Sequence, residues 1–331
     1  MNIYDISKKA GVSIATVSRV LNNGEHVSEK TRRKVLSVIE TEGYFPNVFA
    51  RGLNLNTTRT VGILYSDASD LYLANAVYHL ERCFRKCGYD SLLCCCGYEI
   101  DRRKMYINLM LSKKVDAIIL AGSHFVEEYD ADNDYIRMAA QQVPIGILSG
   151  YVSGDNIACA YCDNNRAIFE MANHLFDLGS RQIIFIYNMM SDSIRCKISG
   201  LKEAYKSRGL EYREKYAVYC PITDINALEK YIKAIRNQFQ FDAIICMDDL
   251  FAVAALKYAQ NAHIRVPEQL RIVGYNNSIL SQCTTPMLST VDNRTTELCE
   301  KLVEMVVNIL SNTEGPTEYS LPGELICRGT T

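Results

Sequence analysis

The sequence lacks the motifs of several large enzyme classes and the long apolar segments of membrane proteins. Its 331 residues contain no run of about 18 apolar residues, so no membrane span is expected. There is no Gly-x-x-x-x-Gly-Lys phosphate loop, no Gly-x-Ser-x-Gly nucleophile elbow and no His-Glu-x-x-His zinc motif. The sequence therefore gives no support to the catalytic mechanisms that depend on these motifs.

A secretory signal is also missing from the start of the sequence, and the expected location is the cytoplasm. Disulfides are rare there, so the 13 cysteines are expected to be free. His79, Cys83 and Cys87 follow one another at i, i+4 and i+8 along a helical segment. Three ligands spread over two helical turns cannot all reach one ion, so we expect no metal and no cofactor.

Charge is nearly balanced over the whole chain but is unevenly distributed. The net charge is −2, yet residues 1–60 hold nine lysines and arginines against five acidic residues, and residues 61–331 hold 27 against 33. A basic N-terminal segment on an acidic body suits a DNA-binding domain joined to a larger body. The further basic run at residues 102–104 is expected to form a solvated helix face.

The most informative segment, residues 5–22, fits two short helices joined by a tight turn. Gly11 supplies the turn, because glycine adopts positive φ at little cost, and Ser13 can cap the second helix. A third helix is expected from Ser28 to about Glu42. The apolar residues of the first two helices recur at helical spacing on one face: Ile6, Ala10, Val17, Val20 and Leu21. Two helices packed in this way also occur in ordinary all-α cores, but their size and charge suit the DNA major groove.

The segment that follows strengthens the DNA-binding interpretation. Pro46 can begin a short helix with an apolar edge, and residues 54–58 are polar and unpatterned, as a linker would be. A helix this short needs a partner, either a second subunit or DNA. In combination, residues 4–6, 10–13, 16–22, 27–28, 31–32, 43–47 and 50–53 resemble the lactose-repressor/galactose-repressor (LacI/GalR-type) family of bacterial transcription regulators.

That resemblance implies a domain organisation and a set of DNA contacts. It places a helix-turn-helix domain at residues 1–45, a hinge helix and linker at 46–60 and an effector-binding core at 61–331. The second helix would be the recognition helix, with base-reading residues Ile14, Ala15 and Arg19, and Leu53 of the hinge would wedge into the minor groove. The implied phosphate contacts are Thr16, Ser18, Asn22, His26, Ser28 and Thr31.

The body alternates short apolar runs with helical patterns, which indicates an α/β core of two doubly wound parallel-sheet subdomains. Strands are expected at 61–65, 91–96, 117–120, 145–148, 182–186, 216–219, 243–246, 271–274 and 324–328, and helices at 75–87, 101–113, 166–178, 198–207 and 295–310. The resemblance implies a periplasmic-binding-protein type of core in which the chain crosses between halves three times. One half would then hold residues of about 61–162 and 293–321, and the other about 163–292 and 322–331.

A small-molecule site is expected between the halves, because ligands of open α/β sheets bind beyond the carboxyl ends of the strands. The expected effector-binding residues are Asp67, Leu71, Tyr72, Ser123, Ser149, Asp163, Lys197, Asp248 and Asn276, with Ser66, His124 and Asn188 at neighbouring strand ends. Their hydroxyl, amide, carboxylate and aromatic groups suit a sugar or nucleoside-like effector. For any one of them the alternative is a turn or cap with a local role.

Two positions in the effector list depart from the family pattern. Lys197 stands where the motif usually begins with arginine, and lysine lacks the bidentate fork of a guanidinium. Asn276 stands where the family usually has aspartate, so an anionic acceptor is replaced by an amide. Asp248 can restore a carboxylate.

The sequence is thus expected to encode a ligand-responsive transcription regulator, a repressor of a catabolic operon, that binds a near-palindromic operator as a homodimer. The effector would change the angle between the halves and so the spacing of the two hinge helices. We expect a dimer, because the three residues after Arg328 are too few to form an added tetramerisation helix. The alternatives are a solute-binding protein without a DNA role and, more remotely, a sugar or nucleoside enzyme with Asp248 or Asp163 as its base.

Overall fold

The computed structural model describes residues 2–21, 26–44 and 57–331 of the chain. The chain divides into two compact units, Met1–Arg59 and Thr60–Thr331. The expected hinge helix, with Leu53, and the expected phosphate contact Asn22 lie outside the described residues.

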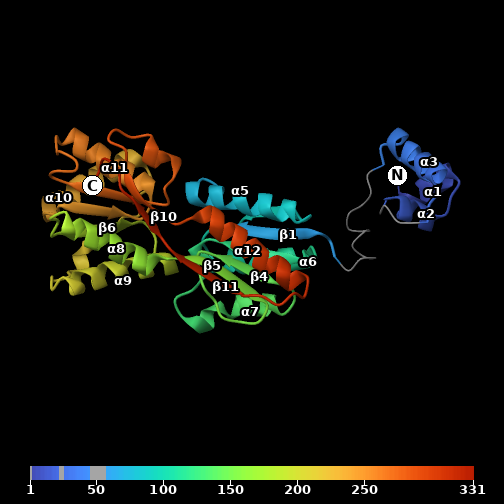
Figure 1. Cartoon of the computed structure of the whole chain (residues 1–331), viewed down its shortest axis with the longest axis horizontal. Coiled ribbons are helices and arrows are strands. Elements are labelled where there is room, and N and C mark those ends of the chain that lie inside the picture. Colours follow the sequence, from blue (N-terminus) through green and yellow to red (C-terminus); the bar gives the residue numbers. More distant parts are fainter. Residues whose placement is uncertain (1, 22–25, 45–56) are drawn as a thin grey trace. The chain divides into compact units, whose positions relative to one another are not determined.

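Three short helices form the described part of the first unit (Figure 1). Gly11 ends the first helix with φ at +58°, a left-handed conformation that favours glycine. Ser28 caps the third helix, and its hydroxyl accepts a hydrogen bond from the Thr31 N–H. The helices are α1 (Ile3–Ala10), α2 (Ile14–Leu21) and α3 (Glu29–Thr41), and they enclose Ile6, Ala10, Val17, Val20 and Val35. The predicted helix-turn-helix arrangement is confirmed.

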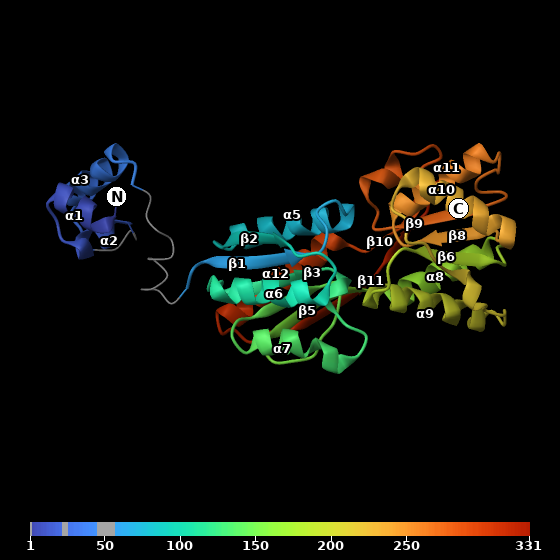
Figure 2. The same ribbon diagram turned by 180° about the vertical axis from the view of Figure 1, so that it is seen from behind.

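The second unit begins with a six-stranded sheet in the order β11-β5-β4-β3-β1-β2. Val61 and Ile63 of β1 pack with α5 and α12 on one face, and Leu64 packs with α6 and α7 on the other. Helices therefore cover both faces of this sheet (Figures 1 and 2). The elements of this half are β1 (Thr60–Tyr65), α5 (Leu71–Lys86), β2 (Asp90–Cys95), α6 (Ile100–Ser112), β3 (Ala117–Ala121), α7 (Asp134–Ala140), β4 (Ile145–Leu148), β5 (Ile157–Asp163), α12 (Thr295–Leu310) and β11 (Glu318–Pro322).

A second six-stranded sheet, in the order β12-β10-β9-β8-β6-β7, forms the other half of this unit. Helix α8 packs against α9, and α10 packs against α11. The two helix pairs lie on opposite faces of the sheet (Figure 2). The elements are α8 (Asn164–Asp177), β6 (Ile183–Tyr187), α9 (Asp192–Ser207), β7 (Ala217–Tyr219), α10 (Ile225–Gln238), β8 (Ala243–Cys246), α11 (Asp249–Asn261), β9 (Arg271–Tyr275), β10 (Ser289–Asp292) and β12 (Glu324–Ile326).

The two sheets exchange chain segments at three places. Strand β5 belongs to the first sheet, and the chain then enters α8 of the second half. Strand β10 belongs to the second sheet, and α12 after it packs on β4 and β5 of the first. Strands β11 and β12 then add one edge to each sheet, and β12 runs antiparallel to β10. The predicted parallel sheets are present, and β12 is the antiparallel exception among the described strands. Strand β11 runs parallel to β5 and so ends at the carboxyl edge of the first sheet. The chain then enters the second sheet from its carboxyl edge, and β12 runs antiparallel to β10.

The expected strands and helices are present, but several elements begin earlier or were not expected. Helix α5 begins at Leu71 because Asp70 caps it, and α9 begins at Asp192 because Ser191 caps it. Strands β5, β10 and β11 and helices α7, α10 and α11 were not expected from the apolar runs. All 13 cysteines are free. None of the described helices has the length and apolar character needed to cross a membrane.

Candidate functional site

Helix α2 presents a short outer face whose side chains reach solvent. Val17 and Val20 are fully or almost fully buried against α1 and α3, which fixes the rotation of α2 about its axis. The opposite side carries Ile14, Ala15 and Arg19, all exposed. The three expected base-reading residues of this helix therefore share an accessible face.

The hydroxyl groups near the ends of the helices hold the turns together. Ser13 Oγ accepts a hydrogen bond from the Thr16 N–H at 3.1 Å and lies 2.9 Å from the Thr16 hydroxyl. Ser28 repeats the pattern with Thr31, with 2.8 Å between the two hydroxyl oxygens. Of the other expected phosphate contacts, Ser18 is half-buried, and His26 is exposed with φ at +70°.

The second unit contains a cleft with two adjoining lobes of about 150 and 80 Å³, lined by residues from both halves. The lining includes eight of the nine expected effector residues: Asp67, Leu71, Tyr72, Ser123, Ser149, Lys197, Asp248 and Asn276. Asp163 does not line the cleft, because its carboxylate caps α8 by accepting the Arg166 N–H at 3.0 Å. The sequence thus located the cleft, and Asp163 has the local capping role.

Two hydroxyl pairs organise the smaller lobe. Tyr72 shares a short hydrogen bond with Ser149, which follows β4 and adopts φ at +69°. Burial raises the pKa of the Tyr72 phenol, so its proton is retained at neutral pH. Ser123 of the first half donates to Ser191 of the second half at 3.1 Å, and both residues are buried. This bond links the two halves directly in the lining of the smaller lobe.

Among the described residues, Lys197 is the positively charged residue that lines the smaller lobe, and its side chain is buried. Its Nζ donates to the Met247 carbonyl at 3.3 Å and lies 3.4 Å from the centroid of the Tyr275 ring. Tyr275 is in turn held by its hydroxyl, which donates to Asn164 Oδ1 at 2.7 Å. Burial lowers the pKa of the Lys197 ammonium to about 8.

Carboxylates and an amide occupy the strand ends that face the larger lobe. Asp67 accepts hydrogen bonds from the N–H and the hydroxyl of Ser69, and these bonds lower its pKa. Asp248 caps α11, and burial raises the pKa of its carboxyl to about 6. Asn276 adopts φ at +86° after β9, and its Oδ1 accepts a bond from Asn293 at 2.9 Å. These side chains offer acceptors and donors suited to a polyhydroxylated ligand.

Comparisons with known proteins agree with this geometry. The family model described as bacterial regulatory proteins, lacI family, matches residues 2–47, and a periplasmic binding protein-like domain matches residues 172–331. An HTH-type transcriptional regulator of Lachnoclostridium phytofermentans is 43% identical over 331 residues, covering 100% of this chain and 99% of the relative. The chain belongs to the LacI family. It is therefore a DNA-binding transcriptional regulator with a ligand-binding domain and not an enzyme.

Solved structures of LacI-family proteins share the fold over the full length of this regulator. The lac repressor dimer bound to operator and the anti-inducer ONPF has a TM-score of 0.86 at 21% identity, covering 100% of this chain and 98% of that one. The complex of the transcriptional regulator CelR with cellobiose has a TM-score of 0.72 at 22% identity, covering 100% of both chains. At sequence identities of 21% and 22%, this structural similarity establishes a shared fold only.

Several cleft residues of this LacI-family regulator were not among the expected residues. They are Asp70, Tyr98, Asn164, Ser191, Tyr275 and Asn293. Asp70 and Ser191 could have been found as caps that place the first turns of α5 and α9 at the cleft. Tyr98 stacks edge-on with His124, whose pKa burial lowers to about 4, but the sequence gives no signal for that contact.

The expectation of a solvated face at residues 102–104 is wrong for Arg103. Its exposed fraction is 6%, its Nη1 lies 2.8 Å from Glu127 Oε1, and it donates to the His124 carbonyl. Arg103 therefore fixes the loop that carries Ser123 and His124 into the cleft.

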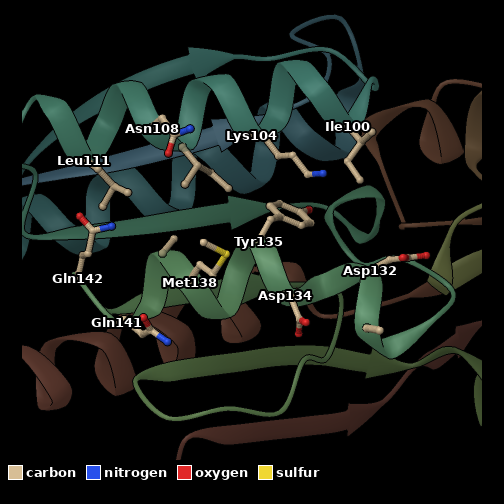
Figure 3. A pocket seen from close by; sticks show the side chains of 13 residues that line it. Ile100, Lys104, Asn108, Leu111, Asp132, Asp134, Tyr135, Met138, Gln141 and Gln142 are labelled. Carbon is tan, nitrogen blue, oxygen red and sulfur yellow. The ribbon is translucent and has the colours of Figure 1, made fainter.

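A separate groove of about 570 Å³ lies between α6 and α7 on the first half (Figure 3). Tyr135 and Met138 of α7 face Lys104 and Leu111 of α6 across it (Figure 3). None of the expected effector residues lines this groove, so it is distinct from the cleft between the halves.

Proposed function

We propose that this LacI-family regulator represses a catabolic operon by binding a near-palindromic operator as a homodimer, and that a sugar or nucleoside-like effector in the cleft changes its DNA affinity. One observation carries the DNA-binding part of this proposal. Ile14, Ala15 and Arg19 are exposed together on α2, on the side opposite the buried Val17 and Val20. A regulator of this kind acts at the chromosome, so we place it in the cytoplasm.

The exposed face of α2 sets what it can recognise. Arg19 can donate two parallel hydrogen bonds to guanine O6 and N7 in the major groove. Ile14 and Ala15 have no side-chain donors, so they can only pack against thymine methyls or base edges. Polar readout by this helix therefore rests on Arg19, while Thr16, Ser18, Asn22, His26, Ser28 and Thr31 position the domain on phosphates. Leu53 is proposed as the minor-groove wedge on the family pattern alone.

The homodimer is supported by the open edge of the first sheet. Strand β2 is the edge strand, and its Leu93 is 44% exposed. Tyr78 on α5, the helix that packs against β2, is 53% exposed. Exposed apolar side chains beside an unpaired strand edge are typical of a surface that a partner covers. A second copy of this chain is the partner that a two-half operator requires.

The effector proposal rests on the cleft between the halves. Of the residues expected from the sequence, we keep Asp67, Leu71, Tyr72, Ser123, Ser149, Lys197, Asp248 and Asn276, which line it. Asp163 is left out because it caps α8. The CelR structure holds cellobiose, which is consistent with a saccharide ligand in this fold. An effector that contacts both halves favours one angle between them, and we propose that this angle sets the spacing of the two hinge helices.

The proposal is tested by DNase protection of the full-length protein on the DNA upstream of its own gene. We expect one protected site with two related half-sites in inverted order. Binding should fall steeply as salt is raised, because phosphate contacts release counterions. Repeating the footprint in the presence of individual sugars and nucleosides should identify at least one compound that changes the protein concentration needed for half-maximal protection. A protected site without two-fold symmetry, occupied by one protein chain, would refute the dimeric operator model.

A further inference from the structure

Two carboxylates in the cleft have no ion-pair partner among the described residues, and they come from opposite halves. Asp70 caps α5 and uses Oδ1 to accept the Leu73 N–H at 2.9 Å. Asp248 caps α11 and uses Oδ1 to accept the Phe251 N–H at 2.9 Å. Both line both lobes of the cleft, and no described salt bridge includes either of them. Each half therefore contributes one half-buried carboxylate to the cleft, and neither carboxylate has a described cation within ion-pair distance.

The other acidic groups of the larger lobe already have internal partners. Asp67 is bonded to Ser69, as described above. The carboxylate of Asp249 accepts the Ser278 N–H and the Thr290 hydroxyl, each at 2.6 Å. Asp67 also has a hydrogen bond with the Tyr98 side chain, whereas Asp70 and Asp248 bond only to N–H groups of their own helices. Asp70 and Asp248 are therefore the carboxylates of this lobe that have no side-chain partner among the described residues.

No described lysine or arginine lines the larger lobe, although four aspartates do. Lys197 lines only the smaller lobe, where its ammonium donates to the Met247 carbonyl and lies over the Tyr275 ring, and its charge lowers the pKa of Asp248. His124, whose pKa is lowered, is neutral at pH 7. An anionic ligand such as a phosphosugar would meet like charge in the larger lobe, whereas a cation would meet opposite charge.

The two carboxylates also repel one another. Burial raises the pKa of Asp70 and Asp248, and the charge of Asp70 contributes to the shift at Asp248. Lys197 offsets part of the charge of Asp248, but no cation contributes to the pKa shift of Asp70. A positive charge between the two carboxylates reduces their repulsion and supplies Asp70 with a counter-charge. Metal binding is disfavoured, because no three metal-ligating side chains converge among the described residues. An organic ammonium group needs only the two carboxylates.

We propose that the effector is an amine-bearing saccharide, an amino sugar, whose ammonium group binds between Asp70 and Asp248 while its hydroxyls bind the polar groups nearby. This inference rests on the proposed function, since it names the chemical class of the cleft's ligand. Because Asp70 and Asp248 belong to opposite halves, the ammonium also holds the halves together. A neutral sugar can donate hydroxyl hydrogen bonds to the same oxygens but leaves the charge of Asp70 uncompensated.

The test is calorimetric titration of the full-length protein at pH 7 with matched pairs of ligands. The pairs are glucosamine with glucose and galactosamine with galactose, and N-acetylglucosamine keeps the skeleton while removing the charge. We expect the amine of at least one pair to bind about tenfold or more tightly than its neutral partner, the size of one charge-assisted hydrogen bond. Asp70→Asn and Asp248→Asn should each abolish that preference, because asparagine keeps the cap but not the charge.

Asp224→Asn is the matched control, since Asp224 also caps a helix (α10) but is exposed and does not line the cleft. It should keep the preference of the wild type. Equal or tighter binding of the neutral sugars, or an amine preference that survives in both cleft variants, overturns the amine proposal and leaves a neutral effector in place. If no member of either pair binds, the amino-sugar proposal is overturned, and the DNase footprint decides the operator proposal separately.

Discussion

The ammonium of Lys197 lies over the face of the Tyr275 ring, 3.4 Å from its centroid. This cation–π contact, with one hydrogen bond to the Met247 carbonyl, compensates a buried charge that has no carboxylate within ion-pair distance among the described residues. The ring is fixed by the bond from its hydroxyl to Asn164. Lysine at this position therefore contributes a charge and a donor to the cleft without the fork of an arginine.

Replacing Lys197 with methionine should change how stability depends on pH. The folded-state pKa of about 8 lies below the ordinary value of 10.5, so the unfolded chain holds more protons between these values. The free energy of unfolding of the wild type therefore increases as pH rises through that window. The Lys197→Met protein lacks the titrating ammonium, so its free energy of unfolding does not show this increase. From about pH 7 to pH 9.5 the wild type should gain about 2 kcal/mol on the variant in chemical denaturation followed by circular dichroism. A difference between the two proteins that stays constant over this range would contradict the buried-charge account.

Asp248→Asn should show the opposite dependence at acidic pH. The folded carboxyl keeps its proton up to about pH 6, against an ordinary value of 3.8, so ionising it penalises the folded state. The wild type should therefore lose stability relative to Asp248→Asn as pH rises from about 4 to 7. As pH rises over this range, the melting temperature of Asp248→Asn should become higher than that of the wild type measured in parallel. Asp224→Asn shows how much of the change belongs to any cap substitution, and the same separation there would refute the assignment.

The sequence predicted the elements whose residues carry a strong local pattern. Strand β1 is a continuous apolar run between polar residues, and the match at 61–65 is within one residue. Helix α12 was predicted from Thr295 to Leu310, and the structure has the same bounds; its buried residues recur at helical spacing. Local pattern is sufficient when burial on one face determines the element.

The unpredicted parts of the cleft depend on residues far apart in the chain. Arg103 is buried because the loop after β3 folds over α6 and supplies Glu127, a contact between positions that no local pattern connects. Asp163 was predicted in the cleft because it lies at the first crossing between the halves, but its polar side chain caps the following helix. Strand ends thus located the cleft, while the orientation of each side chain depended on tertiary packing.

Gly200→Ala should destabilise the core, because α8 and α9 approach most closely at this residue. A Cβ at Gly200 would lie 2.1 Å from the Asn165 carbonyl oxygen, and this is backbone that cannot rotate away. We expect a loss of about 1–3 kcal/mol or more in unfolding free energy as the helices move apart. Gly209→Ala is the control, since open space surrounds it and only its φ of +65° is unfavourable, at a cost of about 1 kcal/mol. Equal losses would argue against close packing as the reason for glycine at 200.

Arg19→Ala should remove sequence preference while leaving most non-specific DNA affinity. Losing a bidentate guanine contact costs about 1–3 kcal/mol at the operator, whereas bulk DNA loses only one charge. Fluorescence anisotropy with operator and scrambled duplexes at one salt concentration measures both. Arg33→Ala removes the same charge from an exposed residue of α3 that pairs with Glu29, and it should keep the preference. An Arg19→Ala protein that still prefers the operator to the same degree would show that another residue reads the bases.

Leu93→Asp should convert the proposed dimer into a monomer, because it puts a charge on the exposed edge strand β2. The alternate residues Leu92 and Cys94 pack with the α6 face, so Leu93 points to the other side of the sheet and its substitution leaves that core intact. In sedimentation equilibrium the wild type should have about twice the chain mass of 37.4 kDa, and the variant should have the chain mass. Met138→Asp is the matched control, since Met138 is 66% exposed on α7, which packs against β4 rather than the β2 edge. A Leu93→Asp protein that remains dimeric would move the interface away from β2, and a monomeric Met138→Asp protein would place it at the groove between α6 and α7.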